Sequence, residues 1–226
     1  MTAGVTATTA LVAVGAAAAL LALALVLVLA RSHRRARDDR RRLEGITRQL
    51  ALARDEARRN RLLADLDGLT GLHNRRYFHE LLAREVARAQ RYGRQLALVV
   101  FDLDDFKSIN DRIGHLAGDA VLAETAERAR GVVRSADIAC RVGGDEFAVL
   151  LPEVSGREAE LLCLRLREAV SSKPVAEAGT VSVSAGIAEL QAGEEPNAFF
   201  ERADEALYRA KELGKAQTHV ASVNGA

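Results

Sequence analysis

Carboxylates stand at two turns of the sequence, each next to a strongly apolar run. Asp102 comes directly after 96–101, an unbroken apolar run of strand length. Asp145 and Glu146 follow a pair of glycines and lie between further apolar runs, a pattern typical of a β-hairpin with an acidic tip. Converging carboxylates repel one another unless cations lie between them, and Mg²⁺ bound to a substrate's phosphates fits such an oxygen-rich site. The pattern therefore predicts metal-assisted chemistry on a phosphorylated substrate.

The same stretches admit plainer interpretations. Taken alone, the hairpin tip is also compatible with a solvated turn, and residues 102–111 with an ordinary acidic turn. A calcium-binding loop is excluded, because Phe106 and Lys107 stand where such a loop needs an oxygen ligand and a glycine.

Apolar periodicity predicts one α/β domain that carries these turns. Strand-length apolar runs alternate with stretches of helical periodicity from about residue 65 onward. We expect a single domain with a mixed central sheet, covering helices and an active-site β-hairpin. The expected helices are 75–90, 116–132, 157–170 and 196–214, and the expected strands are 96–101, the hairpin 137–151, 181–190 and a short terminal strand 217–222.

Charge and cysteine content exclude several classes of function. The formal net charge is +1, so nothing in the overall composition indicates a nucleic-acid partner. Cys140 and Cys163 each lie in apolar sequence and have no Cys-x-x-Cys spacing, which argues against a disulfide framework and against a zinc site. We expect both to be buried thiols in a reducing compartment.

The N-terminal region predicts a membrane anchor. Leu11–Ala30 is apolar throughout, interrupted by Gly15, and is long enough for a helix of about 30 Å, the thickness of a bilayer's hydrocarbon core. Arginines follow at once, which by the positive-inside rule places them in the cytoplasm. We expect an extracytoplasmic tail over 1–7, a transmembrane helix over 8–30 and a single-pass protein of the bacterial inner membrane. A cleavable signal peptide is the competing interpretation.

Residues 31–64 predict a helical linker. Apolar or small residues recur there at alternating steps of three and four, from Leu43 to Ala64, which favours a short parallel coiled coil. Such a coil would pair two copies of the domain over 65–222. The alternative is a single exposed helix whose basic face contacts anionic membrane lipid.

The acidic hairpin belongs to a series of motifs that resembles the GGDEF family, the diguanylate cyclases. Gly143–Phe147 resembles the family's signature, 67–76 its opening motif and 102–119 its second. Two later stretches, 184–186 and 206–211, resemble its remaining motifs, so the resemblance covers roughly residues 65–215. It implies an enzyme that condenses two GTP molecules into cyclic di-GMP, with release of two pyrophosphates, across a homodimer of such domains.

The resemblance also implies roles for individual residues. Asp145 and Glu146 match the catalytic positions, with Asp145 as proton acceptor. Asn110 and Asp119 match the guanine-reading residues. The implied metal positions, for two Mg²⁺ or Mn²⁺ ions per active site, are Asp102, the Leu103 carbonyl, Asp145 and Glu146; the implied phosphate contacts are Lys107, Lys211, Lys215 and the backbone of Gly143 and Gly144.

Arg134 and Asp137 resemble the family's Arg-x-x-Asp inhibitory site, where cyclic di-GMP binds as product and inhibitor. After Lys215 the family often carries Asn, and here Ala216 stands instead. Three other functions are compatible with the same sequence pattern: a catalytically silent cyclic di-GMP receptor, a cyclase that uses another nucleotide, and a membrane scaffold.

Overall fold

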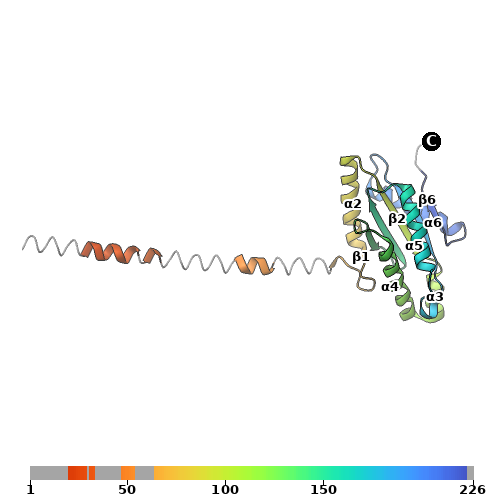
Figure 1. Cartoon of the computed structure of the whole chain (residues 1–226), viewed down its shortest axis with the longest axis horizontal. Coiled ribbons are helices and arrows are strands. Elements are labelled where there is room, and N and C mark those ends of the chain that lie inside the picture. Colours follow the sequence, from red (N-terminus) through yellow and green to blue (C-terminus); the bar gives the residue numbers. More distant parts are fainter. Residues whose placement is uncertain (1–19, 30, 34–46, 54–63, 223–226) are drawn as a thin grey trace, which may run out of the picture. The chain divides into compact units, whose positions relative to one another are not determined.

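The computed structural model describes residues 20–29, 31–33, 47–53 and 64–222. The chain divides into two compact units, Met1–Arg61 and Leu62–Ala226. In the first unit the described residues are helical. The second unit holds a mixed six-stranded sheet with the strand order β1-β3-β4-β2-β5-β6, and helices pack against it (Figure 1). The predicted fold class, a mixed α/β domain with covering helices and a β-hairpin, is confirmed for this unit.

Strand β2 (Leu96–Leu103) lies inside the sheet and is buried along its whole length. It pairs antiparallel with β4 (Glu146–Pro152) on one side and with β5 (Val183–Glu189) on the other. The parallel pairs are β1 (His73–Asn74) with β3 (Ile138–Arg141), and β5 with β6 (Thr218–Val220). An unbroken apolar run is typical of such a doubly covered strand.

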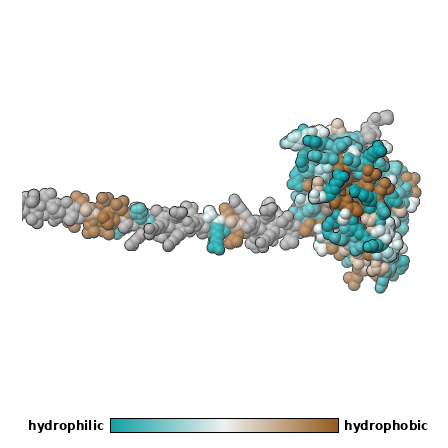
Figure 2. Space-filling model, viewed as in Figure 1, coloured by the Kyte–Doolittle hydropathy of each residue, from teal (hydrophilic) through white to brown (hydrophobic). Residues whose placement is uncertain are grey.

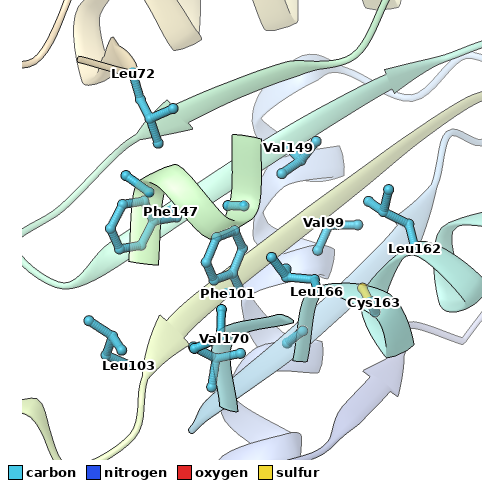
Figure 3. Packing of buried hydrophobic residues seen from close by; sticks show 14 of the residues in the cluster. Leu72, Val99, Phe101, Leu103, Phe147, Val149, Leu162, Cys163, Leu166 and Val170 are labelled. Atoms are coloured by element: carbon cyan, nitrogen blue, oxygen red, sulfur yellow. The ribbon is translucent and has the colours of Figure 1, made fainter. Parts of the chain in front are cut away.

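The two faces of β2 contribute to different hydrophobic clusters. Val99 and Phe101 point into the cluster formed with α3 (Phe106–Ile113), α4 (His115–Val132) and α5 (Gly156–Ser171). Figure 3 shows this cluster, in which the rings of Phe101 and Phe147 stack 5.1 Å apart. Leu98 and Val100 point to the opposite face, covered by α2 (Arg75–Tyr92) and α6 (Pro196–Glu212). The alternation places every even-numbered side chain of β2 on the α6 face.

Helix α5 shows how local sequence defines an element here. Ser155 caps its first turn and Glu158 returns a hydrogen bond to the cap, which forms a complete capping box. Its inward face is buried in the core, whereas Leu161 and Leu164 are 58% and 56% exposed. Figure 2 shows hydrophobic residues at the surface over this helix. Helix α5 thus carries apolar residues on both sides.

The predicted membrane anchor is not supported, and the predicted localisation in the bacterial inner membrane is wrong. In the part of the chain that the structure describes, no helix is long and apolar enough to cross a membrane. Of the predicted span 8–30, the structure describes residues 20–29, which are helical. The rest of the predicted span, 8–19 and residue 30, lies outside the described residues. The predicted contact with membrane lipid loses its basis with the anchor.

The predicted linker lies partly outside the described residues. Residues 31–33 and 47–53 are helical, and 34–46 and 54–63 are not described. The coiled coil and the boundaries of the linker therefore stay predictions. Both cysteines are buried as expected, and burial raises the pKa of each thiol, Cys140 and Cys163, to about 12.

Helix α6 approaches β5 closely at Gly186, because glycine leaves no side chain between them. A Cβ atom at this position would lie 2.1 Å from the Ala203 carbonyl oxygen and 2.2 Å from the Leu207 nitrogen. Both are backbone atoms of a packed helix, so neither can move without shifting α6 from the sheet. This contact sets the distance between α6 and the strands beneath it.

We expect Gly186→Ala to lower the free energy of unfolding by about 3 kcal/mol or more, because the helix must move away from the sheet. Gly131→Ala is the matched control, since a Cβ atom at Gly131 in α4 meets no atom within 4 Å. That variant should be neutral or gain about 0.5 kcal/mol. Urea denaturation of both variants measures the difference, and equal midpoints would contradict the close approach.

Candidate active site

Acidic and polar side chains form a row across three neighbouring strands at one end of the sheet. The register pairs Asp102 of β2 with Glu146 of β4 and with Ser184 of β5. Paired residues on adjacent strands point to the same face, and for Asp102 that is the face covered by α6. The predicted meeting of Asp102 with the hairpin therefore occurs in the fold.

Asp102 is buried, and its charge is balanced by a lysine of α6. Lys211 Nζ lies 2.9 Å from Asp102 Oδ2. Burial raises the pKa of Asp102 to about 6; the hydrogen bond from Lys211 opposes this rise, and the neighbouring charges of Asp145 and Glu146 add to it. The site thus concentrates negative charge around a carboxylate that is costly to ionise.

The hairpin between β3 and β4 brings its carboxylates to the end of β2. The Leu103 N–H donates to the Asp145 carbonyl (3.4 Å), and the Val142 N–H donates to the Glu146 carbonyl (2.9 Å). Neither tip glycine has a positive φ angle. A Cβ atom at Gly143 would lie 2.4 Å from Glu146 Oε2, so the Glu146 side chain fills the space beside this glycine.

An ion pair between distant residues supports the hairpin tip. Arg141 Nη2 donates to the Gly144 carbonyl (2.7 Å), and Arg141 Nη1 donates to Asp67 Oδ1 (3.1 Å). Thr70 donates to the same carboxyl from its backbone and its hydroxyl. Partial burial raises the pKa of Asp67, but the hydrogen bonds from Thr70 and Arg141 outweigh it and hold the pKa below its ordinary value. The motif at 67–76 therefore positions the hairpin.

The predicted guanine-reading residues lie close together between α3 and α4. The side-chain oxygen of Asn110 is buried without a hydrogen-bond partner. A Cβ atom at Gly118 would lie 1.8 Å from that oxygen, so Gly118 provides the space that Asn110 occupies. Asp119 is the next residue and is exposed near the beginning of α4. An unpaired buried acceptor beside an exposed carboxylate fits a ligand with N–H donors.

The predicted phosphate-binding lysines approach the site from two elements. Lys107 is exposed on the first turn of α3. Lys215 follows α6, and its Nζ donates to Asp105 Oδ1 at 2.6 Å. Lys211 contacts Asp102 near the end of β2, and Lys215 contacts Asp105 just beyond it. Two of the three lysines therefore contact carboxylates at this end of the strand.

Asp104 is a buried carboxylate that the sequence patterns did not single out. Its Oδ1 accepts from the Ser184 hydroxyl (2.7 Å), and its Oδ2 accepts from the Ser182 hydroxyl (2.7 Å) and the Ala216 N–H (3.0 Å). The spacing Asp-x-Asp was visible, but the partners of Asp104 come from residues about 80 and 110 positions later. Its oxygens are thus occupied by the protein itself.

The residues of the predicted inhibitory site, Arg134 and Asp137, form a compact turn of their own. The Arg134 N–H donates to Asp137 Oδ2 (2.7 Å), and the Asp137 N–H donates to the Arg134 carbonyl (3.1 Å). Beside the turn lies an open pocket of about 370 Å³, which Arg130, Arg134 and Asp137 help to line. The Arg134 side chain is exposed and available to a ligand.

The donor set fits Mg²⁺ or Mn²⁺ when a substrate completes it. Asp102, Asp145 and Glu146 supply the hard oxygen atoms that these ions prefer. Among the described residues, no group of three or more His, Cys, Asp or Glu side chains is arranged to hold an ion alone. Magnesium commonly uses only one or two carboxylates together with the phosphates of its substrate, so this arrangement fits an ion that arrives with a nucleotide.

We expect Asp102→Asn to stabilise the metal-free protein by about 1–2 kcal/mol at pH 8, since it removes a buried charge. The pKa of this carboxyl is about 6 in the folded chain and 3.8, its ordinary value, in the unfolded chain, so the ionised form destabilises the fold above pH 6. That penalty fades as the pH falls from 6 toward 4. Thermal unfolding in EDTA from pH 4 to 8 measures the difference in stability between this variant and the wild type, with Asp111→Asn, at an exposed position, as control. A difference that does not change with pH would refute the raised pKa of Asp102.

A family model described as "Diguanylate cyclase, GGDEF domain" matches residues 64–217. The chain is 48% identical over 158 residues to the diguanylate cyclase DgcP of Pseudomonas aeruginosa, which covers 69% of this chain and 24% of that protein. The chain thus spans about a quarter of the length of this relative.

Solved structures agree with this match. The coiled coil and GGDEF domain of DgcB from Caulobacter crescentus, in complex with c-di-GMP, is 34% identical with a TM-score of 0.74, covering 80% of this chain and 97% of that one. The diguanylate cyclase SiaD of Pseudomonas aeruginosa, in complex with its activator SiaC, is 31% identical with a TM-score of 0.78, covering 96% and 85%.

Proposed function

The chain belongs to the GGDEF family of diguanylate cyclases, and we propose that it condenses two GTP molecules into cyclic di-GMP across a dimer of its domains. The observation that carries this proposal is the pairing of Asp102 with Glu146 across β2 and β4, with Lys211 at 2.9 Å from Asp102. A carboxylate row with a lysine beside it matches what a metal-bound triphosphate requires. The matching relative DgcP is itself named a diguanylate cyclase.

In the proposed reaction each domain holds one GTP. When bound, Mg²⁺ or Mn²⁺ ions, held by Asp102, the Leu103 carbonyl, Asp145 and Glu146, would neutralise charge at the α-phosphate. Asp145 accepts the proton of the 3′-hydroxyl while that oxygen attacks the α-phosphorus of the GTP in the partner domain. The bond to the bridging oxygen breaks and pyrophosphate leaves. A second, equivalent step closes the ring and releases the second pyrophosphate.

The remaining residues bind and orient the nucleotide. The free amide oxygen of Asn110 accepts from guanine, and the exposed Asp119 carboxylate accepts from the N1 and N2 hydrogens. Gly143 and Gly144 leave the hairpin backbone open to phosphate oxygens; at Gly144 even a Cβ atom would meet nothing within 4 Å. Lys107, Lys211 and Lys215 supply positive charge, so Lys211 and Lys215 must exchange their carboxylate partners for phosphates.

Turnover of GTP by the full chain tests this proposal. With GTP and Mg²⁺ we expect cyclic di-GMP and pyrophosphate as products, and Asp145→Asn should lower the rate by about 10² or more because a proton acceptor and metal ligand is lost. Asp111→Asn is the matched control on α3. Chromatography of the products measures both, and ATP in place of GTP separates a cyclase for another nucleotide. A wild-type protein that binds cyclic di-GMP without forming it would be a receptor instead.

Product inhibition is the second part of the proposal. Cyclic di-GMP would bind at the turn of Arg134 and Asp137, where a guanidinium can contact guanine and phosphate. We expect Arg134→Ala to raise the inhibitory concentration of cyclic di-GMP at least about tenfold, the value of one strong charged contact. Initial rates without product should stay unchanged. Rates measured against added product provide the test; unchanged inhibition would remove this site.

A further inference from the structure

The loop after α6 has a strained backbone. Gly214, Lys215 and Ala216 have φ angles of 119°, 62° and 47°. Lys215 and Ala216 carry a Cβ atom, and the left-handed conformation costs such residues about 1 kcal/mol or more each. Consecutive residues of this kind persist only where the surrounding structure holds them, and they gather at functional sites.

Two side chains hold this loop from opposite sides. Asp104 accepts a hydrogen bond from the Ala216 N–H at 3.0 Å, and Arg167 of α5 donates to the Ala216 carbonyl. Asp104 is itself fixed by the hydroxyls of Ser182 and Ser184, both at 2.7 Å. Its backbone N–H also donates to the Ser182 carbonyl (2.9 Å). The peptide groups on both sides of Ala216 therefore have fixed directions.

The held backbone determines where the Lys215 side chain goes. Its Nζ reaches Asp105, which lies between β2 and α3, while Lys211 reaches Asp102 near the end of β2. In an unstrained loop the chain would leave α6 in another direction, and Lys215 would no longer be directed to the acidic end of β2. Asp104 and Arg167 hold the backbone of this loop and need not contact a substrate themselves.

We propose that Asp104 and Arg167 are positioning residues that hold the loop 214–216 in its strained form and so direct Lys215 to the triphosphate of the substrate. This proposal rests on the proposed function for the identity of the substrate. It also gives Asp104 a role different from that of Asp102: the Asp104 carboxylate accepts from Ser182, Ser184 and the Ala216 N–H, and it acts through Lys215.

Binding of α,β-methylene GTP, whose α–β bond cannot be cleaved, tests the proposal in the full chain with Mg²⁺. Lys215→Met should weaken binding about tenfold, the value of one charge-assisted contact. Asp104→Asn and Arg167→Gln should each weaken it about three- to fivefold, because an amide cannot accept from all three donors and glutamine does not reach the Ala216 carbonyl. Calorimetry measures these affinities, and Arg165→Gln, on the exposed side of α5, is the control with unchanged affinity.

Two further readouts separate positioning from general loss of structure. Guanosine, followed by NMR, should bind all variants equally, because the base site between α3 and α4 is untouched. In the Lys215→Met background, Asp104→Asn and Arg167→Gln should cause no further loss of affinity for the analogue. The effects of residues that act through the same side chain are not additive. If Asp104→Asn does not fold, Arg167→Gln carries the same test.

The outcomes also separate this proposal from the proposed function. The positioning role would be overturned if the losses of affinity for the analogue are additive in the double variants, or if guanosine binding weakens as much as analogue binding. Either result would do so even if cyclic di-GMP forms normally. Non-additive losses in a protein that binds the analogue but makes no cyclic di-GMP would support positioning and refute the cyclase. A wild-type protein that does not bind the analogue would overturn both.

Discussion

The register between β2 and β4 is the constraint on which the site depends. Side chains alternate between the faces of a strand, so a slip of one residue would turn Asp102 from α6 into the cluster that holds Phe101. The apolar residues of β2 oppose such a slip, because both faces of the strand are filled. Core packing thereby fixes an acidic pair whose own charges would favour separation.

Much of this arrangement could be predicted from the sequence because it is local. The strand before Asp102 is an unbroken apolar run, and the hairpin has glycines between strand formers. Helix α3 was not predicted, because it is short and polar and is preceded by Asp105, which has a positive φ angle and makes no side-chain cap. Strand β1 has two residues and depends on pairing with β3. With eight and two residues, these elements are too short for their sequence pattern to identify them.

The contacts that complete the site join distant parts of the chain, and sequence patterns do not report them. Arg141 meets Asp67, and Asp104 meets Ala216, across 74 and 112 positions. The space beside Gly118 and Gly143 is likewise filled by the side chains of Asn110 and Glu146, which only the folded chain places there. The membrane prediction failed for a different reason: it rested on hydropathy alone, and no helix among the described residues is long and apolar enough to cross a membrane.

The two buried cysteines have a practical consequence. The whole chain contains only these two, Cys140 and Cys163, and burial with a pKa of about 12 keeps both as unreactive thiols near neutral pH. A cysteine introduced at the exposed Gly144 would then be the chain's one readily labelled position. Spin labels attached there could report the separation of the two hairpin tips in the proposed dimer by electron–electron distance spectroscopy, with no need for a cysteine-free background.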